Sequence, residues 1–293
     1  MRKIIHAILT PTLPLILVAG WGCADKTVST PDALLLVETA YKQKDYQRLM
    51  TVTDSLEHTG DLLTATANYW RGYACDRQKQ KSEAIAYWQK AISDAAKSES
   101  PENLDIYVKS ASRLANLLVL NRDYKATLDM ANPVVERLEA LKCDSTSDYI
   151  NLLIYIGLSQ VSMGMSEQNT QVGFLRACRK HRENIDKHHT DAAYKDAIAG
   201  LVNIAYYCVT AGNYESALYF TSNFGDLLIE YEQRSEADQQ YVDRQVGRYT
   251  IYKACALNKL GRMDEAAEAY RAFLATNFST TSEGQKLAQD YQQ

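Results

Sequence analysis

The amino-acid sequence predicts an all-α protein built as a solenoid of about six helical hairpins. Its composition favours helices, because 46% of the 293 residues are hydrophobic, 23% are charged, and only 13 Gly and 5 Pro occur. A pattern of small and aromatic residues at helical spacing also recurs along the chain. Since each hairpin of a solenoid buries its apolar stripe against its neighbours, such a fold grows by adding hairpins and needs no second core.

The clearest copy of the pattern covers residues 65–91, which read as two short amphipathic helices joined by a tight turn. Gly72 lies on the first helix, and Ala84, Trp88 and Ala91 follow on the second at offsets of four and three. Small residues let two helices approach closely where they cross, and a large residue fills the groove between hairpins. We therefore predict that Gly72 and Ala84 lie at a helix crossing beside Trp88.

Two other segments, residues 201–220 and 249–274, repeat this pattern closely, with turns expected at Gly212 and Gly261. Three weaker copies can be placed by their turns. The crossing position of the six first helices is small in five of six copies. The crossing residues are Val37, Gly72, Ala115, Gly157, Ala205 and Ala254. The filler position of the second helices is aromatic in only two copies, and its residues are Thr53, Trp88, Ala131, Gly173, Thr221 and Tyr270.

Together these copies resemble the tetratricopeptide repeat (TPR), a helix–turn–helix unit of about 34 residues. The crossing residues are 35, 43, 42, 48 and 49 positions apart, so the helices or the loops between hairpins are expected to be longer than in the family. The resemblance implies a right-handed solenoid that has no catalytic cleft. It also implies that the first helix of each hairpin lines a concave groove that binds a protein or peptide.

In the family, groove residues lie three positions before and one after the crossing residue, and again one turn later. Mapped onto this sequence, these positions give nine candidate partner-binding residues: Tyr69, Tyr73, Arg77, Asn116, Asn151, Tyr206, Arg248, Asn258 and Lys259. Tyr and Arg are the residue types that anchor interfaces. The alternative is that the tyrosines pack between hairpins. Asn116 resembles part of the family's clamp for a carboxylate, but the accompanying lysines are missing, so that activity is not assigned.

Residues 1–22 read as a signal peptide. Arg2 and Lys3 precede a mostly apolar run to Ala19, and Pro11 and Pro14 make that run unsuitable for a spanning helix.

Cys23 follows Gly20-Trp21-Gly22, which resembles the lipobox of bacterial lipoproteins, whose Cys is acylated and becomes the N-terminus. That family prefers Leu where this chain has Gly20, and cleavage after Ala24 with simple secretion is the alternative. The predicted organisation is a signal peptide (1–22), a lipidated tether (23–30) and a solenoid (31–293). The expected location is the bacterial cell envelope, with the protein anchored in a membrane.

The first helix should begin at Pro31, capped by Thr30, and the same arrangement recurs at Ser100 and Pro101. The segment from Ser282 to Tyr291 reads as a further helix, either a terminal cap or the first half of another repeat.

Without Arg2 and Lys3 the chain has 30 basic and 36 acidic residues and no long basic run, so we do not expect it to bind nucleic acid.

The sequence offers little chemistry for catalysis. It has no Gly-rich phosphate loop, no G-x-S-x-G and no H-E-x-x-H motif, so we predict neither an enzyme nor a cofactor. The histidines His181, His188 and His189 are expected at a solvated helix end rather than around a metal ion. Cys75 and Cys208 occupy equivalent positions and are expected as buried thiols.

These patterns predict a lipid-anchored envelope scaffold that binds a protein or peptide through its groove. The first alternative is the sensory N-terminal half of a membrane signalling protein, in which a transmembrane effector follows the repeats. The second alternative is a glycan-capturing lipoprotein, but those proteins need a loop-rich second half that this chain is too short to hold.

Overall fold

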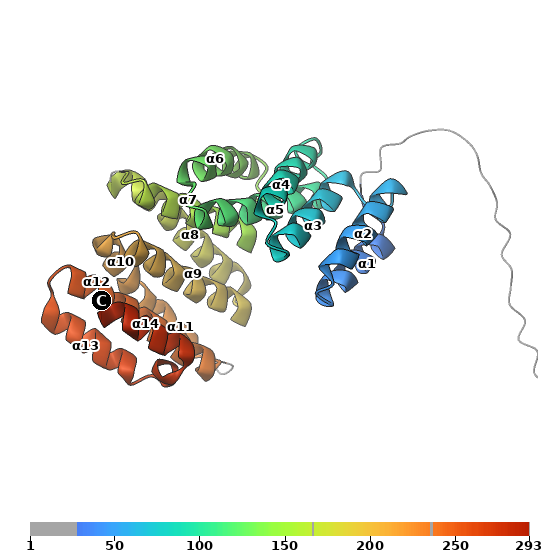
Figure 1. Cartoon of the computed structure of the whole chain (residues 1–293). Helices are drawn as coiled ribbons and strands as arrows, with labels where there is room; N and C mark the ends of the chain where they lie inside the picture. The colour runs from blue at the N-terminus through green and yellow to red at the C-terminus, as the bar shows by residue number, and fades with distance from the viewer. Residues whose placement is uncertain (1–27, 166, 235–236, 293) are drawn as a thin grey trace, which may run out of the picture.

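The computed structural model describes residues 28–165, 167–234 and 237–292. The predicted signal peptide and Cys23 lie outside these residues. Within them no strand occurs, and the hairpins follow one another from α1 and α2 at one end to α13 and α14 at the other (Figure 1). The predicted all-α, right-handed solenoid is confirmed. None of the described helices combines the length and the apolar content that crossing a membrane would require.

Six helical hairpins account for most of the described chain. In order, they are α1 (Pro31–Lys42) with α2 (Tyr46–His58), α3 (Thr64–Arg77) with α4 (Lys81–Ala95), α5 (Pro101–Leu120) with α6 (Tyr124–Ala140), α7 (Ser147–Ser162) with α8 (Glu167–His188), α9 (Asp191–Thr210) with α10 (Tyr214–Ser222) and α11 (Phe224–Glu232), and α12 (Gln239–Lys259) with α13 (Met263–Leu274). A short 3₁₀ helix, η1 (Asn277–Thr280), and α14 (Ser282–Gln292) follow. The long repeat spacing comes largely from long helices, because α5, α8, α9 and α12 have 20–22 residues.

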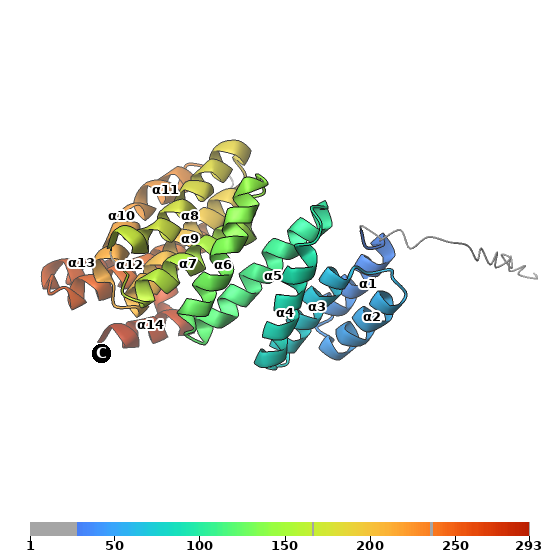
Figure 2. The ribbon, with the colours of Figure 1, turned by 90° about the horizontal axis from the view of Figure 1, so that it is seen from above.

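The helices form two layers. First helices of successive hairpins contact one another, α3 with α5, α5 with α7, α7 with α9 and α9 with α12. The second helices of the first five hairpins pack between the first helix of their own hairpin and that of the next, as α4 does between α3 and α5 (Figure 2). The first-helix layer is therefore the continuous surface of the solenoid.

Every hairpin turn uses the same backbone geometry. One residue adopts a left-handed conformation, and the N–H of the next residue donates to the carbonyl five positions earlier at 2.9–3.2 Å. This is the hydrogen bond of a Schellman C-cap. The left-handed residues are Lys44, Lys79, Arg122, Gly164, Gly212 and Gly261. The predicted turns at Gly212 and Gly261 are thus confirmed, and the other copies show that glycine is not obligatory at this position.

The predicted crossing residues are all buried where the two helices of a hairpin meet. A Cβ atom at Gly72 would lie 2.6 Å from the indole of Trp88, as the pattern predicts. In the fourth hairpin, a Cβ atom at Gly173 would lie 2.5 Å from the backbone nitrogen of Gly157. The aromatic residue there is Phe174, one position after the predicted filler, and its ring covers Gly157. Two glycines therefore give this hairpin an especially close backbone approach.

The predicted helix starts are confirmed. Thr30 caps α1, which has Pro31 in its first turn, and Ser100 caps α5 in the same way. The chain just before α1 is also held in place, because Ser29 N and Oγ donate to the carboxylate of Glu102 at 2.7 and 2.5 Å. Around α1, α2 and α3 the buried apolar side chains form a cluster distinct from the main core, comprising Ala33, Val37, Ala40, Leu49, Leu62, Ala67, Tyr73 and Ala74.

The far end of the solenoid carries α14, as predicted. Tyr291 of α14 stacks on Tyr270 of α13 with ring centroids 4.5 Å apart. Phe278 of η1 fills the space over Gly247 of α12, where an added Cβ atom would lie 2.5 Å from its ring. These contacts let α14 cover the end of the last hairpin.

Candidate protein- or peptide-binding groove

A row of large polar and aromatic side chains runs along the first-helix layer. It occupies the position two residues before the crossing residue on five consecutive first helices, α3, α5, α7, α9 and α12. We call it the groove row, and its members are Trp70, Arg113, Tyr155, Asn203 and Tyr252. The first four are half-buried and Tyr252 is 5% exposed. Since neighbouring first helices touch, the members of the row lie on five successive helices in contact with one another.

At the N-terminal end of the row, two arginines lie against one tyrosine ring. The guanidinium carbons of Arg77 and Arg113 lie 4.9 and 5.4 Å from the centroid of the Tyr73 ring. Arg77 Nε also donates to the Tyr73 hydroxyl at 3.0 Å. Among the described residues, no carboxylate lies within ion-pair distance of either arginine. Held by an aromatic ring instead of a carboxylate, both guanidinium groups keep hydrogen-bonding capacity for a partner.

Further aromatic rings extend this end of the groove onto the first hairpin. The ring of Tyr41 on α1 lies 5.4 Å from Trp70 and 5.0 Å from Tyr73, measured between centroids. Tyr41, Tyr46, Tyr73 and Arg77 line an open hollow together with Lys42 and Lys44. This region combines aromatic contact area with positive charge.

The middle of the row is occupied by Tyr155 of α7. Burial raises the pKa of its hydroxyl well above the usual range, and Tyr207 of α9 raises it further, whereas Arg113 of α5 lowers it. Tyr155 therefore lies within electrostatic reach of both neighbouring first helices and stays protonated at neutral pH, so that it can donate a hydrogen bond.

At the C-terminal end, Arg248 of α12 donates from Nη2 to Oδ1 of Asn203 on α9 at 3.0 Å. Its guanidinium carbon lies 6.0 Å from the ring of Tyr252, and its Nε lies 3.8 Å from the carboxylate of Glu283 on α14. The rings of Tyr206 and Tyr252 approach to 5.4 Å between centroids. This end is thus more fully paired than the N-terminal end.

The nine residues predicted from the family pattern divide by burial. Tyr69 and Tyr73 are only 7% and 4% exposed, so they serve mainly in packing. Four are exposed: Arg77, Asn151, Tyr206 and Lys259. Three are half-buried: Asn116, Arg248 and Asn258. The position three before the crossing residue is buried on all five helices, where it carries Tyr69, Ser112, Ile154, Val202 and Ile251. Of these two positions on the first helices, the one two before the crossing residue is therefore the more accessible.

The sequence contained a usable sign of this difference in burial. The position two before the crossing residue carries Trp, Arg, Tyr, Asn and Tyr in succession, whereas the position three before carries mostly aliphatic residues after Tyr69. The contrast between these two positions distinguishes Arg113, Tyr155, Asn203 and Tyr252 as candidate groove residues. The family pattern alone could not distinguish them, because it assigns the groove in advance to the position three before the crossing residue.

One prediction about the histidines is wrong. His181 is 8% exposed rather than solvated, because its ring covers Gly200 on α9, where a Cβ atom would lie 2.4 Å from Nε2. Burial lowers the pKa of His181 to about 4, so its imidazole is neutral at physiological pH. His188 and His189 are exposed, as predicted. No group of side chains suited to hold a metal ion is found in the described part of the chain.

The thiols of Cys75 and Cys208 are free and buried, as predicted, with exposed fractions of 2% and 0%. Burial raises the pKa of Cys208 to about 12, which makes this thiol unreactive.

Comparison with known proteins agrees with the fold. The chain matches the solved structure of RapI in its apo form with a TM-score of 0.51 and 13% sequence identity, over 88% of this chain and 99% of that one. No protein-family model matches the sequence, and neither does any curated protein. The chain therefore has a TPR-like fold, and at this level of identity the likeness concerns the fold alone.

Proposed function

We propose that this protein is a lipid-anchored scaffold of the bacterial cell envelope that binds a protein or peptide segment along the groove row. The observation that carries the proposal is the row itself, with Trp70, Arg113, Tyr155, Asn203 and Tyr252 on five successive helices. Aromatic rings give contact area with little loss of entropy, and arginine gives planar hydrogen bonding. An extended segment lying across these helices would meet each member of the row in turn.

The anchor rests on the sequence, where Cys23 follows the apolar run of the predicted signal peptide. The second candidate function is a sensor that precedes a membrane-spanning effector. Both candidates use the same groove, and they differ in the segment that would lie C-terminal to the repeats. Sequencing the native reading frame beyond Gln293 separates them, because an apolar stretch there would favour the sensor.

The binding experiment is affinity capture from native membranes with purified protein as bait. In the test variant, Arg77→Ala and Arg113→Ala together remove two guanidinium groups from the groove. In the matched control, Lys90→Ala and Lys125→Ala remove two exposed positive charges from the second helices α4 and α6. We expect the wild type and the control to retain the same partner and the test variant to lose it. Equal capture by all three proteins would argue against the groove.

The anchoring experiment is Cys23→Ser. The expected result is a shift of the protein from the membrane fraction to the soluble fraction, and metabolic labelling with a radioactive fatty acid should fall to background. A variant that stays membrane-bound and labelled would rule out Cys23 as the anchor.

A further inference from the structure

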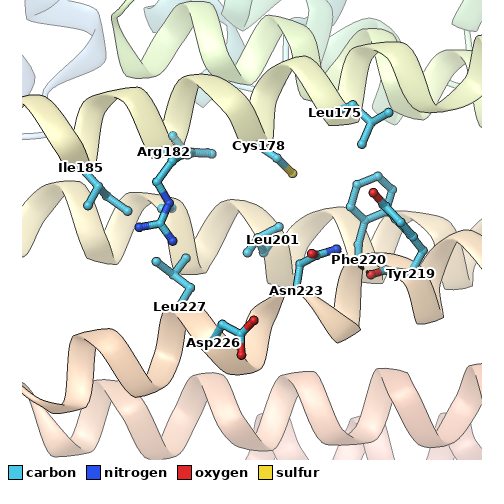
Figure 3. A pocket seen from close by; sticks show the side chains of 12 residues that line it. Leu175, Cys178, Arg182, Ile185, Leu201, Tyr219, Phe220, Asn223, Asp226 and Leu227 are labelled. Carbon is cyan, nitrogen blue, oxygen red and sulfur yellow. Dashed lines mark hydrogen bonds between the residues drawn. The ribbon is translucent and has the colours of Figure 1, made fainter.

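A cavity of about 250 Å³ lies between the fourth and fifth hairpins, away from the groove row. Figure 3 shows side chains of α8 facing those of the α10–α11 segment across it. Its walls combine apolar side chains with the buried imidazole of His181, and its mouth carries the polar side chains of Arg182, Asn223 and Asp226. We propose that this cavity binds a small cationic molecule, an amine attached to a compact aliphatic or aromatic body.

The cavity lies beside a break in the second helix of the fifth hairpin. Ser222 Oγ and Asn223 Nδ2 both donate to the carbonyl of Tyr219, at 2.6 and 3.0 Å. In a regular helix the N–H of Asn223 would bond this carbonyl, but here it does not. Such competition from side chains bends helices. α10 therefore ends at Ser222, and α11 begins at Phe224.

The walls of the cavity suit an apolar body. Cys178 and Ile185 of α8, Leu201 of α9, Phe220 of α10 and Leu227 of α11 line it. An apolar cavity of about 150 Å³ is large enough to bind benzene, so this one has room for a substituted ring. Most ligand pockets combine such walls with a few polar groups that fix the orientation of the ligand.

The mouth of the cavity favours a positive charge. Arg182 is already paired with Glu230, with Nη1 and the carboxylate 2.8 Å apart. Asp226 has no cation within ion-pair distance among the described residues. Asn223 uses its amide N–H on Tyr219, which leaves its Oδ1 as an acceptor. The free groups at the mouth are thus a carboxylate and an amide oxygen, both of which accept hydrogen bonds from an ammonium group.

The test uses three probes of similar shape and different charge: 2-phenylethylamine, 2-phenylethanol and 3-phenylpropionate. Binding is followed by calorimetric titration and by the NMR signals of the methyl groups of Leu201 and Leu227, which line the cavity. We expect the amine to bind about two- to fivefold more tightly than the alcohol, the range of an exposed ion pair, and the carboxylate most weakly. Asp226→Asn should reduce the affinity for the amine to that for the alcohol, and Leu201→Phe should abolish binding by filling the cavity.

Equal affinities for amine and alcohol, or an unchanged affinity in Asp226→Asn, would overturn the assignment of charge. Failure of all three probes to shift the two leucine signals would overturn the site. Because the larger side chain in Leu201→Phe can also disrupt folding, Asp226→Asn with an unchanged melting temperature carries the test by itself. The matched surface control is Glu232→Gln, which alters an exposed carboxylate at the end of α11 and should leave binding unchanged.

Discussion

The indole ring of Trp88 lies directly over the α-carbon of Gly72, and Trp88 Nε1 donates to the carbonyl of Tyr69 at 3.3 Å. Trp88 is 1% exposed, so its ring has little room to move. In the second hairpin, Trp88 therefore occupies the space that the lack of a side chain at Gly72 leaves open, and this close packing stabilises the pair of helices.

Gly72→Ala tests this fit. Alanine normally stabilises a helix by about 1 kcal/mol relative to glycine, but here its Cβ would lie 2.6 Å from the indole. We expect a net loss of about 1–3 kcal/mol in the free energy of unfolding, measured by chemical denaturation, as for other overpacked cores. The control is Gly225→Ala on α11, where nothing lies within 4 Å of the added Cβ and stability should rise. A gain of stability in both variants would contradict the fit.

His181 should make stability depend on pH. Its pKa is about 4 in the folded protein and 6.5 in the unfolded chain, so between these values the unfolded chain binds the extra proton. Stability is therefore lost as pH falls from 6.5 to 4, by about 3 kcal/mol in total. The free energy of unfolding, measured by chemical denaturation at several pH values across this range, should change less with pH for His181→Gln than for the wild type. His188→Gln, which changes an exposed histidine, should follow the wild type.

Replacing a left-handed turn residue by glycine should stabilise the folded protein. Lys79 and Arg122 adopt φ values of 65° and 61°, where a side chain costs about 1–2 kcal/mol and glycine does not. Glycine loses more entropy on folding, so each Lys79→Gly or Arg122→Gly should gain a few tenths to about 1 kcal/mol. The reverse change, Gly212→Ala, should cost a similar amount. Thermal melts that fall for Lys79→Gly would be inconsistent with the turn geometry.

Single alanine variants of Tyr73 and Arg77 should distinguish a residue that packs in the core from one that is available for binding. Tyr73 is 4% exposed, so Tyr73→Ala should cost about 3 kcal/mol of stability. Arg77 is exposed, so Arg77→Ala should change stability by no more than about 0.5 kcal/mol. Denaturation curves of the two single variants measure this difference, and a strongly destabilised Arg77→Ala would reassign that residue to the core.

How much could be predicted from the sequence differed between the core and the groove. The crossing residues and the pairing of Gly72 with Trp88 follow from close packing, which leaves a strong pattern of small residues. The break at Asn223 could not be predicted, because it depends on side chains of Ser222 and Asn223 taking a carbonyl that a helix would normally use. His181 looked solvated because its neighbours are charged, and only the packing of α8 on Gly200 makes it buried. The family pattern did not separate the buried position three before the crossing residue from the more accessible position two before it, because the packing of the first helices decides their burial.

The separate apolar cluster around α1, α2 and α3 has a consequence for local unfolding. In a solenoid, each hairpin is stabilised by its neighbours, and a terminal hairpin has a neighbour on one side only. The α1–α2 hairpin should thus open as a cooperative unit at a lower free energy than the main core. Amide hydrogen exchange would then be faster in α1 and α2 than in α7 and α9. Because Tyr41 of α1 contacts Trp70 and Tyr73, a partner bound there would slow this exchange, and occupancy of the groove could be read from the dynamics of the first hairpin.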